Sequence, residues 1–312
     1  MNELRLTPSD DLSKILNNLT QPTTIYLKSG VYRQKVEIRS SDLTIIGEGR
    51  ETTTITYDDY ARKIHTDGQE FNTFRTYTLC VTGERVKLKN LTVENSNTRP
   101  EKVGQCVALS VNAKSFFCEG VDLKSTQDTL FLAPFPDDLV VRYQGFIPHR
   151  QLYMEGGSLH VFRDCRIYGT VDFVFGCAEA YFTDCKLISI HDERGYGFVA
   201  APAHSLKQER GFVFLNCEFL SEGAGDESVY LARPWRDFGK CEFIDCMVGG
   251  HVKPELYDKW NDTERDKTAR FAHANLNCAY PPSPAPWAKE LNKTEVSDII
   301  NNFRQNILTK FK

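Results

Sequence analysis

The sequence contains no long hydrophobic run, and no stretch approaches the roughly 20 apolar residues of a membrane-spanning helix. Residues 1–11 also lack the continuous apolar core of a signal peptide. The 38 lysines and arginines are scattered, and the 42 acidic residues leave a net charge of −4. A chain without a basic cluster lacks the electrostatic surface that binds nucleic acid. We therefore expect neither a membrane nor a nucleic-acid partner, and a cytoplasmic location unless a leader was removed.

Cysteine and histidine patterns that would bind a metal are missing as well. None of the ten cysteines forms a Cys-x-x-Cys pair, and the seven histidines show no ligand spacing. Gly47-Glu48-Gly49 begins like a phosphate-binding loop, but the residues that complete such a loop are absent. The sequence therefore predicts no metal and no cofactor, and it predicts reduced thiols that pack as small apolar side chains.

The chain does contain enough apolar material for a large core. Apolar residues make up 41% and aromatic residues 12% of the 312 residues, while charged residues make up an ordinary 26%. This length leaves one or two domains open, because elongated all-β folds reach it as a single unit.

A short frame recurs along the chain and indicates the architecture. It consists of an aromatic residue, a polar turn residue, a cysteine and an alternating strand. The intervals between repeats are irregular, as expected for coils that carry loops of different lengths. The five segments are Phe116–Cys118, Phe162–Ile167, Phe182–Leu187, Phe214–Phe219 and Phe243–Val248, and Val86–Val93 has leucine in place of the cysteine.

Short alternating strands with one small residue returning in each repeat predict a solenoid whose coils stack on one another. A parallel β-helix fits this pattern, and we expect this all-β fold as a single domain over residues 1–312. A β-sandwich would also give many short strands. It predicts two-residue Asn-Gly hairpins between them, however, and these are scarce in the sequence.

Helical patterns flank the strands and suggest covers for the open ends of the solenoid. Near the start, apolar residues at helical spacing follow Ser9, a candidate N-cap, and predict a helix over about 9–19. A second pattern behind Thr294 predicts a helix over about 294–308. The proline-rich segment 278–287 before it is expected to be an extended strap along the solenoid or, alternatively, a disordered linker.

Two aspartates lie in apolar, strand-like surroundings, namely Asp128 in Thr126–Phe131 and Asp172 in Gly169–Gly176. A carboxylate among valine, phenylalanine and leucine is costly to desolvate unless it is paired or functional. Two such carboxylates suit acid/base or nucleophilic chemistry on an ester or a glycoside. The alternative is that each aspartate ends a strand and caps a turn.

Four motifs in chain order resemble the signatures of the pectinesterases, the pectin methylesterases. These motifs are Gln105–Leu109, Gln127–Leu130, Gly169–Gly176 and Tyr230–Trp235, and the opening segments Gly30–Tyr32 and Leu43–Gly49 are also similar to the family. The resemblance extends from about residue 20 to about residue 280. Within the family, the chain resembles a bacterial, cytoplasmic-type member.

The resemblance implies a right-handed parallel β-helix with short terminal helices. It also implies an enzyme that hydrolyses the C6 methyl ester of galacturonate units and releases methanol. Asp172 would be the nucleophile that forms a covalent acyl-enzyme, and Asp128 would protonate the departing methanol and then activate water. The implied partner is methyl-esterified galacturonan or an oligogalacturonide, bound by a monomer without a cofactor.

The remaining site residues are implied by the same resemblance. Arg233 would lie beside the nucleophile, favour its ionised form and orient it. Gln105 and Gln127 would donate amide hydrogens to the oxyanion that develops on the ester carbonyl. Trp235 and Val171 would line the sugar subsite. Each assignment has a purely structural alternative. Gln105 and Gln127 could form stacked amides within the solenoid, Arg233 could belong to a surface ion pair, and Trp235 could be part of the core.

The sequence departs from the family pattern in places that bear on the site. Ala232 replaces the glycine before Arg233. Its methyl group restricts the backbone angles and the close packing that glycine permits, and this affects the position of the arginine side chain. The two aspartates are 172 − 128 = 44 residues apart, more than in plant and secreted bacterial relatives. The excess lies in residues 134–154, a loop beside the catalytic coil. We expect this loop to close one end of the cleft and to favour short oligogalacturonides.

Three other functions remain open on the sequence. An esterase of the same fold could act on a different acyl substrate. A β-helix glycosidase or lyase would use paired carboxylates around a glycosidic bond and would produce new reducing ends or unsaturated products. A carbohydrate-binding solenoid without catalysis would be expected to have lost the two carboxylates, and both are present.

Overall fold

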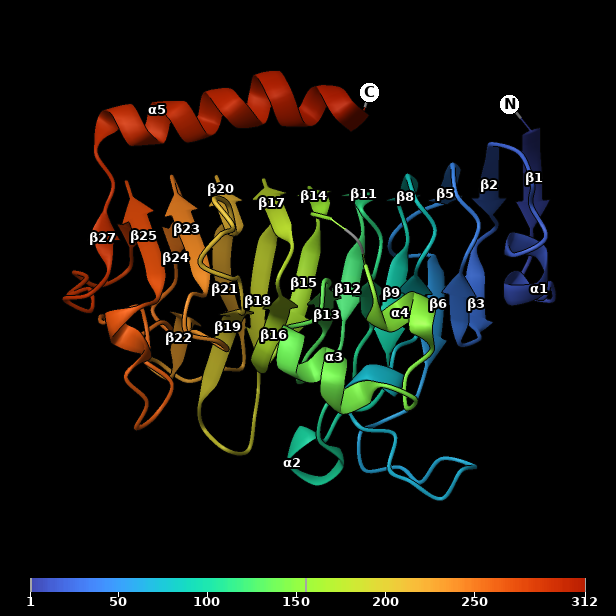
Figure 1. Ribbon diagram of the computed structural model, residues 1–312, viewed down its shortest axis with the longest axis horizontal. Helices are drawn as coiled ribbons and strands as arrows, with labels where there is room; N and C mark the ends of the chain where they lie inside the picture. Colours follow the sequence, from blue (N-terminus) through green and yellow to red (C-terminus); the bar gives the residue numbers. More distant parts are fainter. Residues whose placement is uncertain (1, 155, 312) are drawn as a thin grey trace.

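The computed structural model describes residues 2–154 and 156–311, in which three parallel sheets wind along one axis (Figure 1). Sheet A contains β1 (Asn2–Leu6), β2 (Thr23–Leu27), β5 (Leu43–Gly47), β8 (Val86–Lys89), β11 (Ser115–Glu119), β14 (Leu159–Arg163), β17 (Glu179–Thr183), β20 (Phe212–Leu215), β23 (Lys240–Ile244), β25 (Arg270–Ala274) and β27 (Lys289–Glu290). Sheet B contains β3 (Gly30–Arg33), β6 (Thr53–Tyr57), β9 (Thr92–Asn95), β12 (Asp122–Lys124), β15 (Arg166–Gly169), β18 (Lys186–Ile190), β21 (Glu218–Glu222), β24 (Met247–Val248) and β26 (Asn277–Cys278). Sheet C contains β4 (Val36–Ile38), β7 (Leu79–Val81), β10 (Leu109–Val111), β13 (Leu130–Leu132), β16 (Val171–Gly176), β19 (Gly197–Pro202) and β22 (Val229–Ala232).

Short helices are attached to this framework. They are α1 (Leu12–Leu16), α2 (Pro100–Val103), α3 (Asp137–Tyr143), α4 (His149–Leu152) and α5 (Lys293–Asn302), with 3-10 turns at Thr73–Arg75 and Arg265–Lys267. A π-helix at Phe303–Ile307 and a 3-10 helix at Leu308–Phe311 extend α5. Within the described residues, none of these helices is long and apolar enough to cross a membrane.

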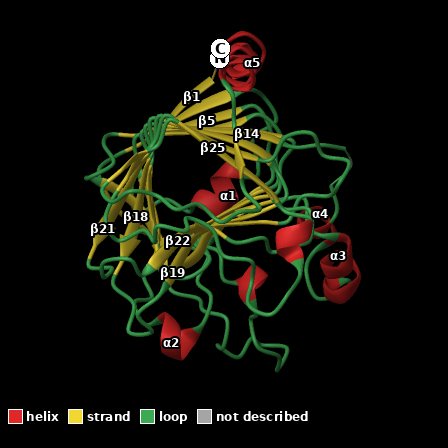
Figure 2. Ribbon diagram, turned by 90° about the vertical axis from the view of Figure 1, so that its left-hand side faces the viewer, coloured by secondary structure: helices red, strands yellow, loops and turns green. Residues whose placement is uncertain are grey.

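Each coil of the chain contributes strands to different sheets, and each strand pairs in parallel with the strand one coil away. In sheet A, β14 pairs with β11 on one side and with β17 on the other. Seen along the axis, the three sheets enclose one core (Figure 2), which buried aliphatic and aromatic side chains fill along the whole solenoid. The expected parallel β-helix is therefore confirmed.

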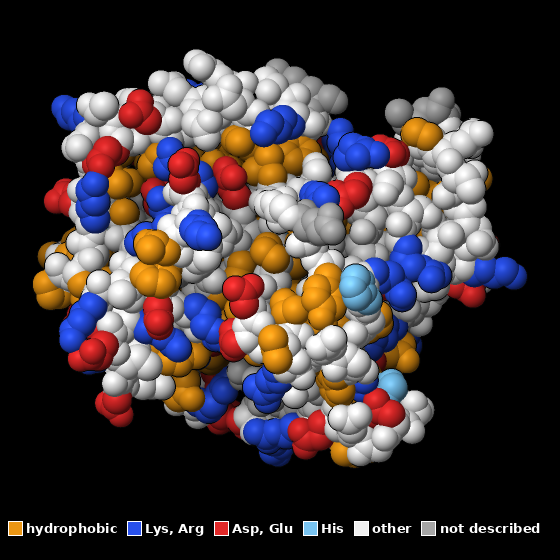
Figure 3. Space-filling view, in the orientation of Figure 1, with side chains coloured by type: hydrophobic (Ala, Val, Ile, Leu, Met, Phe, Trp, Pro, Cys, Tyr) orange, Lys and Arg blue, Asp and Glu red, His pale blue; other side chains and the backbone are white. Residues whose placement is uncertain are grey.

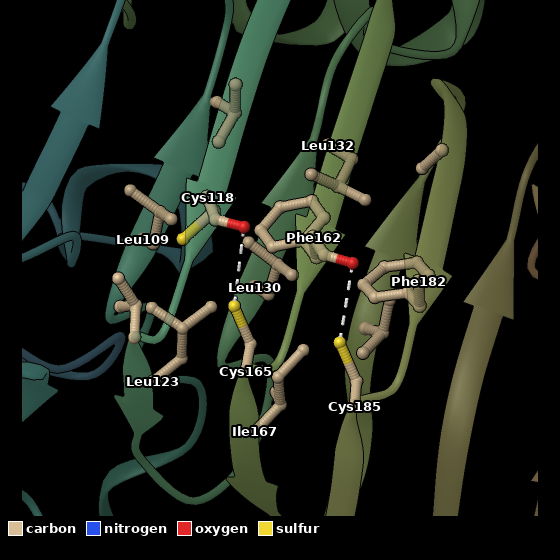
Figure 4. Close-up of a cluster of buried hydrophobic side chains, with 14 of the residues drawn as sticks. Leu109, Cys118, Leu123, Leu130, Leu132, Phe162, Cys165, Ile167, Phe182 and Cys185 are labelled. Atoms are coloured by element: carbon tan, nitrogen blue, oxygen red, sulfur yellow. Dashed lines mark hydrogen bonds between the residues drawn. The ribbon is translucent and has the colours of Figure 1, made fainter. Parts of the chain in front are cut away.

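The repeated cysteines stack at the corner where sheet A leads into sheet B. Each follows an aspartate or asparagine with φ between 50° and 55°, a left-handed turn conformation that these two residue types tolerate best after glycine. Each thiol donates a hydrogen bond of 3.4 to 3.6 Å to a carbonyl one coil earlier, as Figure 4 shows for two of them. The predicted ladder is confirmed for Cys165, Cys185, Cys217 and Cys246.

The prediction that Cys118 belongs to the same ladder is wrong. Cys118 lies within β11, opposite Phe162 of β14. The turn residue of this coil is Gly120, with φ of 65°, and it follows the cysteine instead of preceding it. Val121 therefore occupies the corner position, where its carbonyl accepts a hydrogen bond from Arg166 N at 3.0 Å.

Phenylalanines form a second column inside sheet A. Phe162, Phe182, Phe214 and Phe243 stack with ring centroids 4.9, 4.6 and 4.8 Å apart and with planes inclined by at most 12°. All four rings are fully buried. Offset stacking adds to the burial of large apolar surfaces, so this column stabilises the coils that also carry the cysteines.

The N-terminal end of the solenoid is covered by α1, which lies across the opening of the coil in Figure 2. Leu12 and Leu16 are buried against the first coils. The cap is Asp11, whose carboxylate accepts a hydrogen bond from Lys14 N at 2.9 Å, and not Ser9 as expected. The helix is confined to Leu12–Leu16, because the preceding residues form a turn in which Asp10 accepts from Thr7 N at 2.7 Å.

The C-terminal helix does not cover an end of the solenoid. Figure 1 shows α5 running along the outside of sheet A, roughly parallel to the solenoid axis. Its apolar side packs on outward-facing residues of that sheet, and the cluster includes Val161, Tyr181, Ile299 and Phe303. Asn292 and Glu295 form a capping box at its start.

The proline-rich strap closes the C-terminal end instead. Trp287 packs on the rings of Tyr257 and Phe271, with centroids 6.0 and 5.3 Å apart, over the last coils. Ala285 N donates a hydrogen bond of 3.0 Å to Glu255 O, which fixes the strap to the preceding loop. The strap thus provides the end protection that the sequence argument assigned to the helix.

Residues 134–154 fold into α3 and α4 on the outer face of sheet C. The two helices bury an apolar cluster against Phe74, Phe131 and Phe175, and hydrophobic side chains gather on the face of the molecule that carries them (Figure 3). Ser158 Oγ donates a hydrogen bond of 2.7 Å to Ala133 O, so the two ends of the excursion lie side by side. The long loop is thus a folded wall on the sheet that carries the candidate site.

Candidate active site

Most of the side chains singled out in the sequence line one pocket beside sheet C. Gln127 and Asp128 precede β13, Asp172 lies in β16, and Arg233 follows β22. Together with Gln105, which precedes β10, they line a pocket of about 540 Å³. Because each coil stacks on the one before it, residues far apart in the chain converge here.

Both aspartates have a left-handed backbone, with φ of 63° at Asp128 and 52° at Asp172. Such conformations persist at non-glycine residues where the surrounding structure fixes them, and they concentrate at functional sites. Asp128 N donates a hydrogen bond of 3.1 Å to Val171 O, and the pairing of β16 with β19 is irregular between Val171 and Val174. This bulge re-aims Asp172, so that its side chain lines the pocket with only 8% of the residue exposed.

Arg233 holds Asp172 with two parallel hydrogen bonds. Its Nε donates to Oδ1 at 2.8 Å and its Nη2 donates to Oδ2 at 2.6 Å. The guanidinium lies between the rings of Phe198 and Trp260, 3.8 and 3.9 Å from their centroids. The backbone after Ala232 is tied to the sheet by a 2.9 Å bond from Arg233 N to Ala200 O. The alanine methyl group therefore leaves the expected ion pair in place.

Asp128 is in the opposite electrostatic situation. Burial and the negative charge of Asp172 raise its pKa well above the ordinary 3.8, against smaller lowering effects of Arg233 and of a hydrogen bond from Gln127. The site thus contains one carboxylate paired with a guanidinium and one carboxyl group biased towards its neutral form. This division lets one group attack while the other donates a proton.

The two glutamines have different surroundings. Gln127 Oε1 accepts a hydrogen bond of 3.0 Å from Arg194 Nη1, which directs its amide NH₂ away from that arginine. Arg194 is itself fixed by Asp192, whose carboxylate accepts from Nε at 2.9 Å and from Nη2 at 2.6 Å. The side chain of Gln105 lines the pocket, where no described residue hydrogen-bonds its amide. The amide of Gln105 is thus available as a donor to a bound ligand, and the amide of Gln127, which also donates to Asp128, carries two hydrogens.

Of the two residues expected at a sugar subsite, the structure brings one to the pocket. Trp235 lines it and packs edge-on against Phe175, with centroids 5.6 Å apart. Val171 is 2% exposed and is not among the described residues that line this pocket. Its contribution is the backbone carbonyl that accepts from Asp128 N.

The described residues contain no group of three or more potential metal ligands among histidine, cysteine, aspartate and glutamate. Cys106 lies one residue beyond Gln105, and burial raises the pKa of its thiol to about 12. A thiol held protonated in this way is a poor nucleophile. Carboxylates, amides and guanidinium groups therefore make up the reactive part of the pocket.

The family model described as Pectinesterase matches residues 6–135 and 141–279. The chain belongs to the pectinesterase family. It is an enzyme of that class, and its matched part includes every candidate site residue. The five residues between the two matched ranges lie in α3 and just before it.

Similar pectinesterases come from plants and bacteria. Pectinesterase 31 of Arabidopsis thaliana is 30% identical over 90% of this chain and 82% of its own length, and probable pectinesterase 8 of the same plant is 29% identical over 89% and 66%. Among solved structures, pectin methylesterase PemA from Erwinia chrysanthemi superposes with a TM-score of 0.79 at 22% identity, covering 99% of this chain and 97% of that one. The pectin methylesterase from carrot gives a TM-score of 0.79 at 20% identity, covering 99% and 96%. These neighbours share the parallel β-helix fold.

The insertion of this pectinesterase forms one side of the pocket. Leu139, Arg142 and Tyr143 from α3 line it. Two contacts hold α3 in place: Asp138 accepts from Arg236 Nε and Nη2 at 3.0 and 2.7 Å, and Tyr143 Oη hydrogen-bonds Asn72 Oδ1 at 2.9 Å. The insertion is therefore attached to segments on either side of the pocket.

Sequence reasoning missed several residues that shape the site. Trp260 and Phe198 enclose Arg233, and Arg194 orients Gln127, yet none of them belongs to a recognised motif. Arg194 follows Asp192 by two residues, a spacing that carries little signal on its own.

Proposed function

We propose that the protein hydrolyses C6 methyl esters of galacturonate units in pectin-derived chains and releases methanol. The observation that carries this proposal is the pairing of Asp172 with Arg233 beside a buried Asp128 of raised pKa. Membership of the pectinesterase family supports the ester as the bond that is broken. Pectin methylesterase structures in complex with hexasaccharides support a pectin-derived carbohydrate as the substrate.

In the first half of the reaction, a carboxylate oxygen of Asp172 attacks the ester carbonyl carbon. The carbonyl π electrons move onto oxygen, and the amides of Gln105 and Gln127 donate hydrogen bonds to this oxyanion. When the carbonyl reforms, the bond from carbon to the methoxy oxygen breaks. Asp128 gives its proton to that oxygen, so methanol leaves and an acyl-enzyme anhydride with Asp172 remains.

In the second half, Asp128 acts as a base. Its carboxylate takes a proton from water while the water oxygen attacks the acyl carbon. Collapse of the second oxyanion breaks the bond to Asp172 and releases the galacturonic acid product. Asp172 is again a carboxylate and Asp128 is again protonated, so the cycle closes. Arg233 keeps both oxygens of Asp172 oriented throughout.

The mechanism makes Arg194 a positioning residue, since it acts through Gln127. Replacing Arg194 by methionine frees the amide of Gln127 to rotate. We expect kcat to fall about tenfold with little change in KM, because an oxyanion contact exists mainly in the transition state. Steady-state kinetics on a methyl-esterified oligogalacturonide measures this split. In a Gln127→Ala background the same substitution should have almost no further effect, and a full additional tenfold loss there would contradict the positioning role.

We further propose that short oligogalacturonides are preferred over polymeric pectin. The folded insertion with α3 forms one wall of the pocket, and its attachment through Asp138 and Tyr143 supports a cleft closed on that side. A bacterial origin, a cytoplasmic location and a monomeric state remain predictions from the sequence.

Methanol release from methyl-esterified trigalacturonate and from polymeric pectin tests the proposed function. We expect methanol from both without any change in chain length, and a higher kcat/KM on the trimer. New reducing ends or unsaturated products would point to cleavage of the glycosidic bond instead. A clear preference for the polymer would overturn the proposed size preference, and no methanol from either substrate would favour a different acyl substrate.

A further inference from the structure

The pocket carries a positive charge that no described residue balances. Arg233 is occupied by Asp172, and Arg236 is occupied by Asp138. The third arginine of the lining, Arg142, makes no hydrogen bond or ion pair with any described residue. Its guanidinium lies 5.4 Å from the centre of the Tyr143 ring, and the residue is exposed to solvent.

Neutral Asp128 leaves this charge uncompensated. The pKa of Asp128 is raised by burial and by the charge of Asp172, which favours the protonated form. The ion pairs of Arg233 and Arg236 are each neutral as a unit. Arg142 is therefore the one cation of the described lining without an acidic partner, and such a site attracts an anion.

From this arrangement we infer that Arg142 binds the free carboxylate of a galacturonate unit next to the ester that is cleaved. This inference rests on the proposed ester hydrolysis and adds the substrate class, a partly de-esterified oligogalacturonide. A fully methyl-esterified chain carries no carboxylate for Arg142. Arginine presents a planar fork of donors that matches a carboxylate with two parallel hydrogen bonds.

Because Arg142 lies on α3, its position is fixed before a carboxylate binds. Asp138, which pairs with Arg236, lies four residues before Arg142 on α3. Tyr143, which hydrogen-bonds Asn72, directly follows Arg142. A helix fixed near both ends presents the side chain from a set position, so less entropy is lost on binding. Residues 136–140, which lie outside the family match, contain Asp138 and hence one of these two attachments.

The test compares Arg142→Gln with a matched control, Arg304→Gln, which changes an exposed arginine beyond α5 on the other side of the molecule. The first measurement is calorimetric binding of unesterified trigalacturonate. We expect Arg142→Gln to weaken it roughly tenfold, the size of one charge-assisted contact, and Arg304→Gln to leave it unchanged. Arg142→Lys should recover part of the loss, because it restores the charge without the planar fork.

The second measurement is kcat/KM on trigalacturonate with one free acid and on fully esterified trigalacturonate. Arg142→Gln should lower kcat/KM roughly tenfold on the first substrate and leave the second unchanged. Equal losses on both substrates would reduce Arg142 to a steric element of the wall and overturn the inference, as would unchanged affinity for trigalacturonate. If no substrate releases methanol while Arg142→Gln still weakens trigalacturonate binding, the proposed hydrolysis fails and the anion site stands.

Discussion

Asp172→Asn is expected to lower ester hydrolysis by roughly a thousandfold or more while leaving the fold intact. The amide has nearly the shape of the carboxylate, but it is a poor nucleophile. Asparagine tolerates the left-handed backbone at this position, whose φ is 52°, whereas alanine would add strain. Methanol release under saturating substrate measures the loss, and circular dichroism with a thermal melt checks the fold.

Asp245→Asn is the matched control for this experiment. Asp245 has the same left-handed backbone, with φ of 55°, in a turn between sheets A and B, where it accepts a hydrogen bond from Asn275 Nδ2 at 2.8 Å. It lies outside the pocket lining, so its substitution should leave methanol release unchanged. Retention of near-wild-type activity by Asp172→Asn would remove Asp172 from the role of nucleophile.

Asp128→Asn is expected to lower kcat by about a hundredfold to ten-thousandfold and at the same time to stabilise the protein near neutral pH. The loss of activity follows from the missing proton donor. The gain in stability follows from the raised pKa, because a buried carboxyl group that is disfavoured as an anion costs folding free energy wherever the unfolded chain ionises it.

The pH dependence of this gain has a definite sign. The pKa of Asp128 is higher in the folded protein than in the unfolded chain, so the folded state binds more protons between the two values. The stability of the wild type therefore falls as the pH rises through that interval and is reduced by the full amount above the raised pKa. Below the ordinary value of 3.8 the carboxyl is protonated in both states, and the asparagine variant should have no advantage there.

Thermal melts of the wild type and Asp128→Asn at pH 3 and at pH 7 test this expectation, with Asp245→Asn as the control that should show no such difference. A higher melting temperature of Asp128→Asn at pH 7 alone supports a destabilising, functional carboxyl group. A loss of stability at pH 7 would mean that Asp128 acts as a structural turn residue, which is the alternative that the sequence left open.

The solenoid was predictable because its signal repeats. Four coils place a cysteine after a left-handed aspartate or asparagine, and these cysteines identified the corner of the β-helix. Cys118 shows where this reasoning fails. The residue directly before Cys118 is Phe117, whereas each corner cysteine follows an aspartate or asparagine. The left-handed turn residue of this coil is Gly120, so the missing polar residue before Cys118 was the signal in the sequence that separates a strand cysteine from a corner cysteine.

The site was predictable in part. Motifs located Asp172 and Arg233, whose bidentate contact the structure contains. The residues that support the site residues could not be predicted from the sequence. Arg194 and Trp260 contact Gln127 and Arg233 across coils, and no local sequence pattern marks them. The terminal helices illustrate the same limit. Apolar periodicity predicts that α5 has a buried side, but it cannot say whether a sheet face or an open end covers it.

The hydrogen bond between Ser158 and Ala133 brings the two ends of the insertion together, so the chain leaves the solenoid and returns to it at nearly the same point. An excursion with adjoining ends can be lengthened, shortened or exchanged without shifting the coils before and after it, since closing a longer loop adds little entropic cost. Under the two proposals above, substrate choice lies in this insertion and bond cleavage lies in the coils of the solenoid. The two properties can change independently during evolution or in engineered variants.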